Sequence, residues 1–118
     1  MRTTITSLLL GFCFCHPLYG ADTAGSSGNN AVENGTRLFE QRCSLCHRGT
    51  GPGVFMLERR LGADQSVLEN RSNLTRDYIR TVVRWGVGSM PRFSRGEISD
   101  PELEAIMKYL LNPAIKTP

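Results

Sequence analysis

Residues 43–47 read "CSLCH" and place two thiols and one imidazole within five residues. Three kinds of site use such a group: a dithiol redox centre, a zinc site and a haem attachment site, for which C-x-x-C-H is the signature. A structural zinc ion needs four protein ligands. A dithiol centre normally lies at a strand-to-helix turn of a βαβ pattern, and the sequence contains no convincing strand. The spacing therefore favours covalent haem attachment through Cys43 and Cys46, with His47 as a ligand of the iron.

The N-terminus has the pattern of a secretory signal. Arg2 is the only charge ahead of an apolar run over residues 8–15, and a small residue follows at Gly20. The run is far shorter than the ~20 residues that span a bilayer. We expect cleavage after Gly20 and export to the periplasm, without a membrane span. A buried N-terminal helix fits less well, because nothing caps or ends the segment as a helix. A lipoprotein signal at Cys13 also fits less well, because bulky Phe12 precedes that cysteine.

The composition of the chain after cleavage further limits the kinds of site that the motif can form. Removing the first 20 of 118 residues leaves 98 residues with 13 Lys and Arg against 11 Asp and Glu, a net charge of +2. This charge does not indicate a nucleic-acid-binding surface. Cys43 and Cys46 are then the only cysteines and His47 the only histidine, so a zinc site would lack a ligand. A chain of this length forms one domain with a small core.

The chain is expected to be all-α, with three main helices after a flexible leader. Residues 21–30 form the leader, because they are rich in Gly, Ser and Asn. The first helix covers about residues 31–43 and places Val32, Gly35 and Phe39 on one face with Cys43. Gly35 lowers helix propensity, which indicates a packing reason for its presence.

The other two helices carry local start and stop signals. Thr75 can cap a helix over residues 75–85, which Gly86 can end. Ser99 and Glu102 have the spacing of a capping box for the last helix. The apolar face of that helix repeats at intervals of three and four residues before Pro113 stops it: Leu103, Ile106, Met107, Leu110 and Leu111.

A haem iron held by His47 needs a second axial ligand, and the mature chain has no second histidine. Methionine is the alternative. Met107 belongs to the apolar face of the last helix, and Met56 lies in a Gly-rich loop close to His47. Met90 lies in "GVGSMPRF", where the glycines allow an unusual backbone and Pro91 favours an extended one. Met90 is the predicted ligand, with Met56 or an open iron position as the alternatives.

Four pieces of the sequence carry a resemblance to a known family: "GTRLFEQRCSLCH", "YIRTVVRWG", "GSMPRF" and "DPELEAIMKYL". From about Ala31 to Leu111 the chain resembles the small class I c-type cytochromes of bacteria. The resemblance implies a cytochrome c fold over residues 31–118, with three main helices and loops wrapped around one covalently bound haem c. It also implies Met90 as an axial ligand, and a close crossing of the first and last helices at Gly35.

The expected function is that of a one-electron carrier, which is not an enzyme by itself. The compact layout is similar to that of the cytochrome subunits of flavoprotein 4-cresol and eugenol hydroxylases. This similarity implies a flavoprotein or quinoprotein dehydrogenase as the redox partner. A free shuttle between respiratory redox proteins is the alternative, and a haem sensor or peroxidase-like enzyme would require an open sixth position on the iron.

Further residues have two interpretations each. The family often holds the axial histidine through a proline carbonyl, for which Pro52 is the match. Arg76, Arg80 and Arg84 lie four residues apart and share one helix face without an acid at that spacing. They form either a solvated face or a surface for docking or for haem propionates. Trp85 lines the haem pocket or closes the core, and both interpretations bury it.

Overall fold

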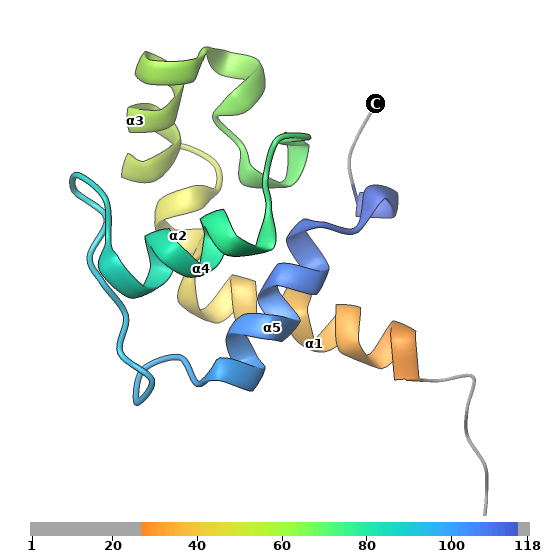
Figure 1. Cartoon of the computed structure of the whole chain (residues 1–118). Coiled ribbons are helices and arrows are strands. Elements are labelled where there is room, and N and C mark those ends of the chain that lie inside the picture. The colour runs from red at the N-terminus through yellow and green to blue at the C-terminus, as the bar shows by residue number, and fades with distance from the viewer. Residues whose placement is uncertain (1–26, 116–118) are drawn as a thin grey trace, which may run out of the picture.

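The computed structural model describes residues 27–115, which fold into α-helices and short 3-10 helices joined by loops (Figure 1). The fold is therefore all-α, as predicted. The predicted signal peptide and residues 21–26 of the predicted leader lie outside the described residues. In chain order the elements are α1 (Ser27–Arg42), α2 (Ser44–His47), α3 (Pro52–Leu61), η1 (Ala63–Gln65), η2 (Leu68–Asn70), α4 (Arg76–Trp85), α5 (Asp100–Leu110) and η3 (Pro113–Ile115).

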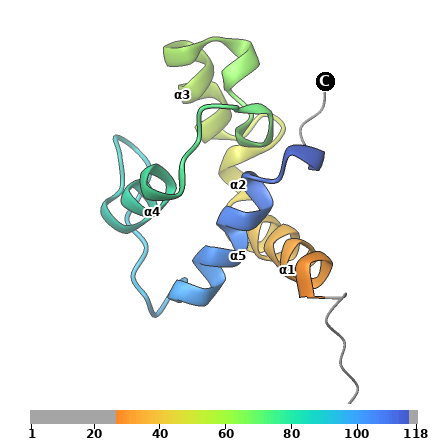
Figure 2. The ribbon, with the colours of Figure 1, turned by 45° about the vertical axis from the view of Figure 1, so that its right-hand side comes forward.

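The first and last helices cross closely and form the centre of the core (Figures 1 and 2). Gly35 lies at the crossing, where a Cβ atom would be 2.1 Å from the Ala105 carbonyl oxygen. One turn further, Phe39 is fully buried, and its ring centroid lies 5.4 Å from that of Tyr109. The predicted face of the first helix, with a glycine at the crossing and an aromatic beside it, is confirmed.

Helix α4 has the predicted boundaries. The Thr75 side chain accepts a hydrogen bond from the Tyr78 amide at 3.2 Å, and Gly86 ends the helix with a φ of 74°. Ile79 and Val83 form its buried face. Trp85 lies two residues beyond Val83, about 200° around the helix, and it is 79% exposed. The prediction that Trp85 is buried is therefore wrong, because the residue ends α4 on the side away from the core.

Two α-helices of the described residues were not predicted. Residues 52–61 form α3, so the segment expected to be a Gly-rich loop at Met56 is helical. The signals were Pro52 at the first helical position, two arginines in the last turn, and Gly62 with a φ of 90° at the end. Helix α2 is a single turn that contains the second cysteine and the histidine.

Helix α1 begins at Ser27, four residues before the predicted start at Ala31. The predicted leader is therefore wrong for residues 27–30, because each residue added to an established helix gains a backbone hydrogen bond at little cost. Within residues 27–115, no helix combines the length and the apolar character that crossing a bilayer requires.

The start of α5 offers a test of local stabilisation. Ser99 and Glu102 form the predicted capping box, with the Ser99 amide donating to the Glu102 carboxylate at 2.7 Å. Ser99→Ala is expected to lower the free energy of unfolding by about 1 kcal/mol, because one amide of the first turn loses its acceptor. Denaturant titration of the haem-loaded protein measures the change. Ser72→Ala, at an exposed loop position, is the control, and equal stability of both variants would contradict the prediction.

Candidate functional site

The residues of the C-x-x-C-H motif lie on one tight turn at the end of α1. Cys43 precedes α2, and its carbonyl accepts from the amides of Cys46 at 3.1 Å and His47 at 3.0 Å. All three line a cavity of about 410 Å³, and Met90 lines the same cavity. The fold therefore brings Met90 to the motif from 43 residues away in the sequence.

The wall of this cavity is mostly apolar. Helices α1, α3, α4 and α5 each contribute to it, through residues that include Phe39, Leu57, Ile79 and Ile106. Four large apolar side chains that are exposed in the chain alone also face the cavity: Phe55, Met56, Tyr78 and Val87. A large apolar group bound there would cover them.

The charged side chains that line the cavity are three arginines, Arg42, Arg60 and Arg71, and no Asp or Glu of the described residues lies among them. Arg71 is only 5% exposed, and its Nε donates to Asn73 Oδ1 at 3.1 Å. A haem is a flat apolar macrocycle with two carboxylates, and arginine pairs well with carboxylates. The residues present therefore fit a haem: apolar walls, cations for its acids, and sulfur and imidazole donors.

These three arginines were not singled out in the sequence. The motif predicts a ligand next to Cys43, but no local pattern shows that the loop after η2 turns the Arg71 side chain inward. Only the position of Arg42, directly before Cys43, was a usable signal.

Met90 is held by a tight turn. The amide of Val87 donates to the Met90 carbonyl at 3.1 Å, and the amide of Met90 donates back to the Val87 carbonyl at 3.0 Å. Gly88 takes a φ of 57° within this turn. Gly86 also has no room for a side chain, because a Cβ atom would be 2.7 Å from the Met90 carbonyl oxygen. The backbone of Met90 is therefore fixed against the end of α4.

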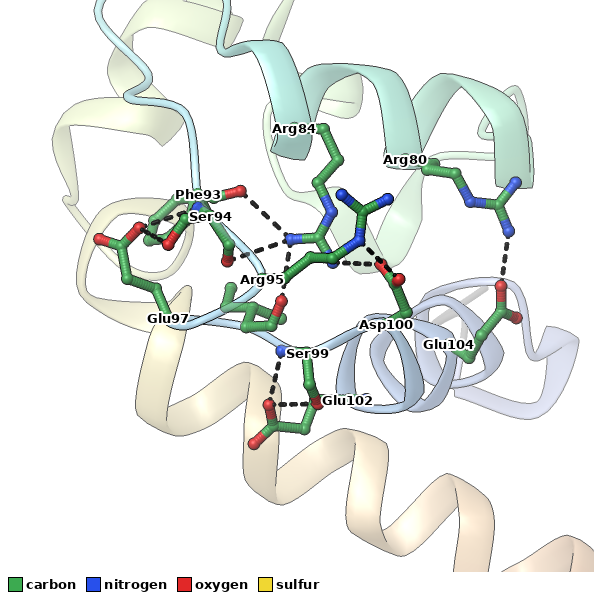
Figure 3. A network of polar contacts seen from close by, with 11 residues as sticks. Arg80, Arg84, Phe93, Ser94, Arg95, Glu97, Ser99, Asp100, Glu102 and Glu104 are labelled. Carbon is green, nitrogen blue, oxygen red and sulfur yellow. Dashed lines mark hydrogen bonds and ion pairs between the residues drawn. The ribbon is translucent and has the colours of Figure 1, made fainter.

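Arg84 fixes the segment that follows Met90 (Figure 3). Its Nη1 donates to three carbonyls, those of Phe93 at 3.2 Å, Ser94 at 3.3 Å and Ile98 at 2.8 Å. Its Nη2 donates to Asp100 Oδ1 at 2.8 Å. The side chain is 13% exposed. Arg84 is therefore a largely buried clamp between α4 and the loop that leads into α5.

The three arginines of α4 pair with acids from α5. Arg76 and Arg80 both pair with Glu104. Arg80 Nη2 lies 2.6 Å from Glu104 Oε1 (Figure 3). Asp77 also pairs with Arg80 at 3.2 Å. None of the three arginines lines the cavity, so they are not in place to bind haem propionates. Glu104 and Asp100 belong to α5 and lie 16 to 28 residues from the arginines they bind, so a search of α4 alone could not find them.

The other two methionines lie in different surroundings. Met107 is fully buried in the core and does not line the cavity, as its place on the apolar face of α5 predicted. Met56 lies in α3, is 43% exposed and does line the cavity. Met90 and Met56 are thus both in reach of this space, and an experiment must choose between them.

The predicted hydrogen bond between His47 and the Pro52 carbonyl is not present. His47 Nδ1 is buried and has no hydrogen-bond partner in the protein. Pro52 is the first residue of α3, and carbonyls at the start of a helix point along its axis toward amides four residues on. Gly53 packs against the imidazole instead, because a Cβ atom there would be 2.9 Å from Nδ1.

The electrostatic surroundings do not favour the dithiol alternative. Burial raises the pKa of the Cys43 thiol to about 11, with smaller contributions from Cys46 and Glu69. A redox dithiol needs a low pKa at its attacking cysteine. Burial also lowers the pKa of His47 and so favours the neutral imidazole, which is the form that binds metals. Within residues 27–115, no three Cys, His, Asp or Glu side chains gather where they could hold a metal ion, so the zinc alternative gains no ligand.

Comparison with known proteins finds similarity to cytochromes. Residues 30–110 match the family described as cytochrome c oxidase, cbb3-type, subunit III. The chain is 31% identical over 116 residues to cytochrome c6 of Cyanidioschyzon merolae, with 98% of each chain covered. It is 36% identical over 81 residues to cytochrome c6 of Bumilleriopsis filiformis, with 69% of this chain and 90% of the relative covered.

A bacterial relative is more distant. Cytochrome c-555 of Methylococcus capsulatus is 26% identical over 111 residues, which cover 93% of this chain and 80% of the relative. No solved structure matches the chain with significance.

Proposed function

The chain belongs to the cytochrome c family, and we propose that it carries single electrons between redox proteins of the periplasm through a haem attached to Cys43 and Cys46, with His47 and Met90 as iron ligands. Members of this family bind one covalent haem c, and the protein is an electron carrier and not an enzyme. The observation that supports the proposed ligands is the single cavity that receives the whole C-x-x-C-H turn and Met90.

The roles of the chain's own residues follow from their positions. When bound, a haem supplies an iron that alternates between the ferric and ferrous states. The apolar walls exclude water, and Arg42, Arg60 and Arg71 offset the carboxylates of the group. Helix α2 orients His47, while the turn at Val87 and the Arg84 clamp restrain Met90. Little movement is then needed when the iron gains or loses an electron.

The attachment is tested on the purified protein. The red pigment is expected to stay with the polypeptide in acidified organic solvent and to be reduced and reoxidised reversibly. A colourless protein, or a pigment that the solvent extracts, would contradict the proposal. A five-coordinate iron with fast carbon monoxide binding would instead favour a sensor or peroxidase-like function.

Met90→Ala is expected to abolish the weak near-red absorption of the ferric protein and to lower its reduction potential, because a methionine ligand raises the potential. The absorption spectrum and a redox titration measure both effects. Met56→Ala is the matched control, since Met56 lines the same cavity, and it is expected to keep the band. Loss of the band in Met56→Ala with retention in Met90→Ala would reverse the assignment.

A finer part of the proposal is that the electrons come from a periplasmic flavoprotein or quinoprotein dehydrogenase of which the chain is a subunit. Trp85 and Leu45 support a partner-binding surface, because they are 79% and 87% exposed and do not line the cavity. Trp is enriched where proteins bind one another. Co-purification with a dehydrogenase at fixed stoichiometry is the test, and a monomer without a stable partner favours the free shuttle.

Export is the other finer part. We expect the mature chain to begin at Ala21, after removal of the apolar N-terminal segment. Intact-mass measurement of the protein recovered from the periplasm gives the cleavage site. A full-length chain in the cytoplasmic fraction would contradict the proposed location.

A further inference from the structure

Arg48, the residue directly after His47, lies at the centre of a cluster of polar side chains from separate elements. Its Nε donates to Glu69 Oε1 at 2.7 Å, and its Nη2 donates to the Tyr109 hydroxyl at 2.6 Å. It also pairs with Glu40 of α1. The Tyr109 hydroxyl donates to the same Glu69 oxygen at 3.3 Å. We refer to Glu40, Arg48, Glu69 and Tyr109 as the Arg48 cluster.

Glu69 is the unusual member of this cluster. The residue is only 8% exposed, and a buried carboxylate is costly unless other groups satisfy it. Its Oε1 accepts from Arg48 and Tyr109, but its Oε2 is buried without a hydrogen-bond partner in the protein. Two carboxylates share one guanidinium, so the Arg48 cluster carries a net negative charge.

The buried carboxylate lies close enough to the motif to act on it. Its Oε1 accepts a hydrogen bond from Arg48, which directly follows His47 in the sequence. His47 Nδ1 is itself a buried polar atom without a partner. The Arg48–Glu69 bond also ties the end of the C-x-x-C-H turn to η2, the element that contains Glu69.

We propose that Glu69 is a positioning residue that, held by Arg48 and Tyr109, places a fixed negative charge beside His47 and lowers the reduction potential of the site. The proposal rests on the proposed function. The ferric site carries one more positive charge than the ferrous site, and the reduction adds one electron. A nearby negative charge therefore stabilises the ferric form. Glu69 would act against the methionine ligand, which raises the potential.

The Arg48 cluster contains its own control. Glu40 and Glu69 pair with the same guanidinium, but their side chains are 45% and 10% exposed. Solvent and salt screen an exposed charge far more than a buried one. Replacing either acid with glutamine removes one negative charge from the same partner. Only the buried charge is expected to affect the iron strongly.

The experiment is a redox titration of haem-loaded wild-type protein, Glu69→Gln and Glu40→Gln. We expect the equilibrium constant for reduction to rise about tenfold in Glu69→Gln, the effect of a weakly screened charge at short range. Glu40→Gln is expected to change it by less than about twofold. The near-red band of the ferric protein should persist in both variants, which shows that Met90 is still bound. An unchanged potential in Glu69→Gln, or equal shifts in both variants, overturns the proposal.

Two further variants separate charge from shape and guard against poor haem loading. Glu69→Asp keeps the charge and is expected to stay close to the wild-type potential; a shift equal to that of Glu69→Gln overturns the proposal. Tyr109→Phe keeps the ring and removes one of the two groups that hold Glu69, so its potential is expected to rise toward that of Glu69→Gln. An unchanged value counts against the proposal even if Glu69→Gln does not load haem. If the proposed function is wrong, the wild-type protein itself carries no haem chromophore, which distinguishes that result from all of these outcomes.

Discussion

Gly35→Ala is expected to destabilise the haem-loaded protein by about 3 kcal/mol, at the upper end of the usual cost of overpacking a core. The added Cβ atom would be 2.1 Å from the Ala105 carbonyl oxygen and 2.9 Å from Tyr109 Cβ. The closest of these atoms belongs to the backbone of α5, so no side-chain rotation can relieve the contact. The two helices would have to separate along the main contact of the core. The higher helix propensity of alanine offsets only about 1 kcal/mol of this destabilisation.

Denaturant titration of the holoprotein measures this loss. Glu33→Ala lies on the same helix at an exposed position and is the control, with an expected change within about 0.5 kcal/mol. The potential is not expected to change in Gly35→Ala molecules that retain haem, because the crossing lies outside the cavity. A Gly35→Ala protein as stable as the wild type would show that α1 and α5 do not approach as closely as described.

Local signals predicted the helices whose boundaries depend on nearby residues. Thr75 and Ser99 cap their helices through amides three residues ahead, and the apolar face of α5 repeats within the helix itself. Each signal needs only a short window of sequence. At α3 the local sequence led to the wrong prediction of a loop. Gly51, Pro52 and Gly53 are typical of a turn, but they are also typical of a helix start.

Tertiary contacts decided what the sequence could not predict. Arg80 lacks an acid four residues away on its own helix, yet Glu104 of α5 lies beside it. Trp85 is apolar and lies in a helix with a buried face, but its position around that helix turns it to solvent. Arg71 is buried because the loop after η2 turns inward. Charge pairs and burial of this kind depend on how helices lie in space.

The candidate site also has a part that local sequence predicts and a part that only tertiary contacts bring together. Cys43, Cys46 and His47 form one short motif, and the chemistry of their spacing predicts that they hold a haem. Met90 was predicted by elimination and from the backbone of its loop. In the Arg48 cluster, Arg48 binds Glu69 and Tyr109, which lie 21 and 61 positions away in the sequence. No pattern in the sequence links Glu69 to His47, and only the folded chain brings its charge near the imidazole.

The double variant Cys43→Ala/Cys46→Ala, which cannot attach haem, is expected to be largely unfolded. Helix α3 buries only Val54, and α4 buries only Ile79 and Val83. Both helices line the cavity, so their packing onto the rest of the chain depends on the group that fills it. With nothing in the cavity, the apolar side chains that line it, among them Phe55 and Tyr78, face water. A domain of this size buries too little other surface to offset the entropy of ordering those helices.

Far-UV circular dichroism and denaturant titration test this expectation against the haem-loaded wild type. We expect most of the helical signal to be lost and no cooperative unfolding transition to remain. Residual helix is expected only in α1 and α5, because these two helices also contact each other directly in the core. Leu45→Ala is the matched control, because it changes the same turn at a side chain that is 87% exposed and leaves both thiols in place. A double variant that keeps native helix content and unfolds cooperatively would mean that the polypeptide, and not the haem, supplies the core around which α3 and α4 fold.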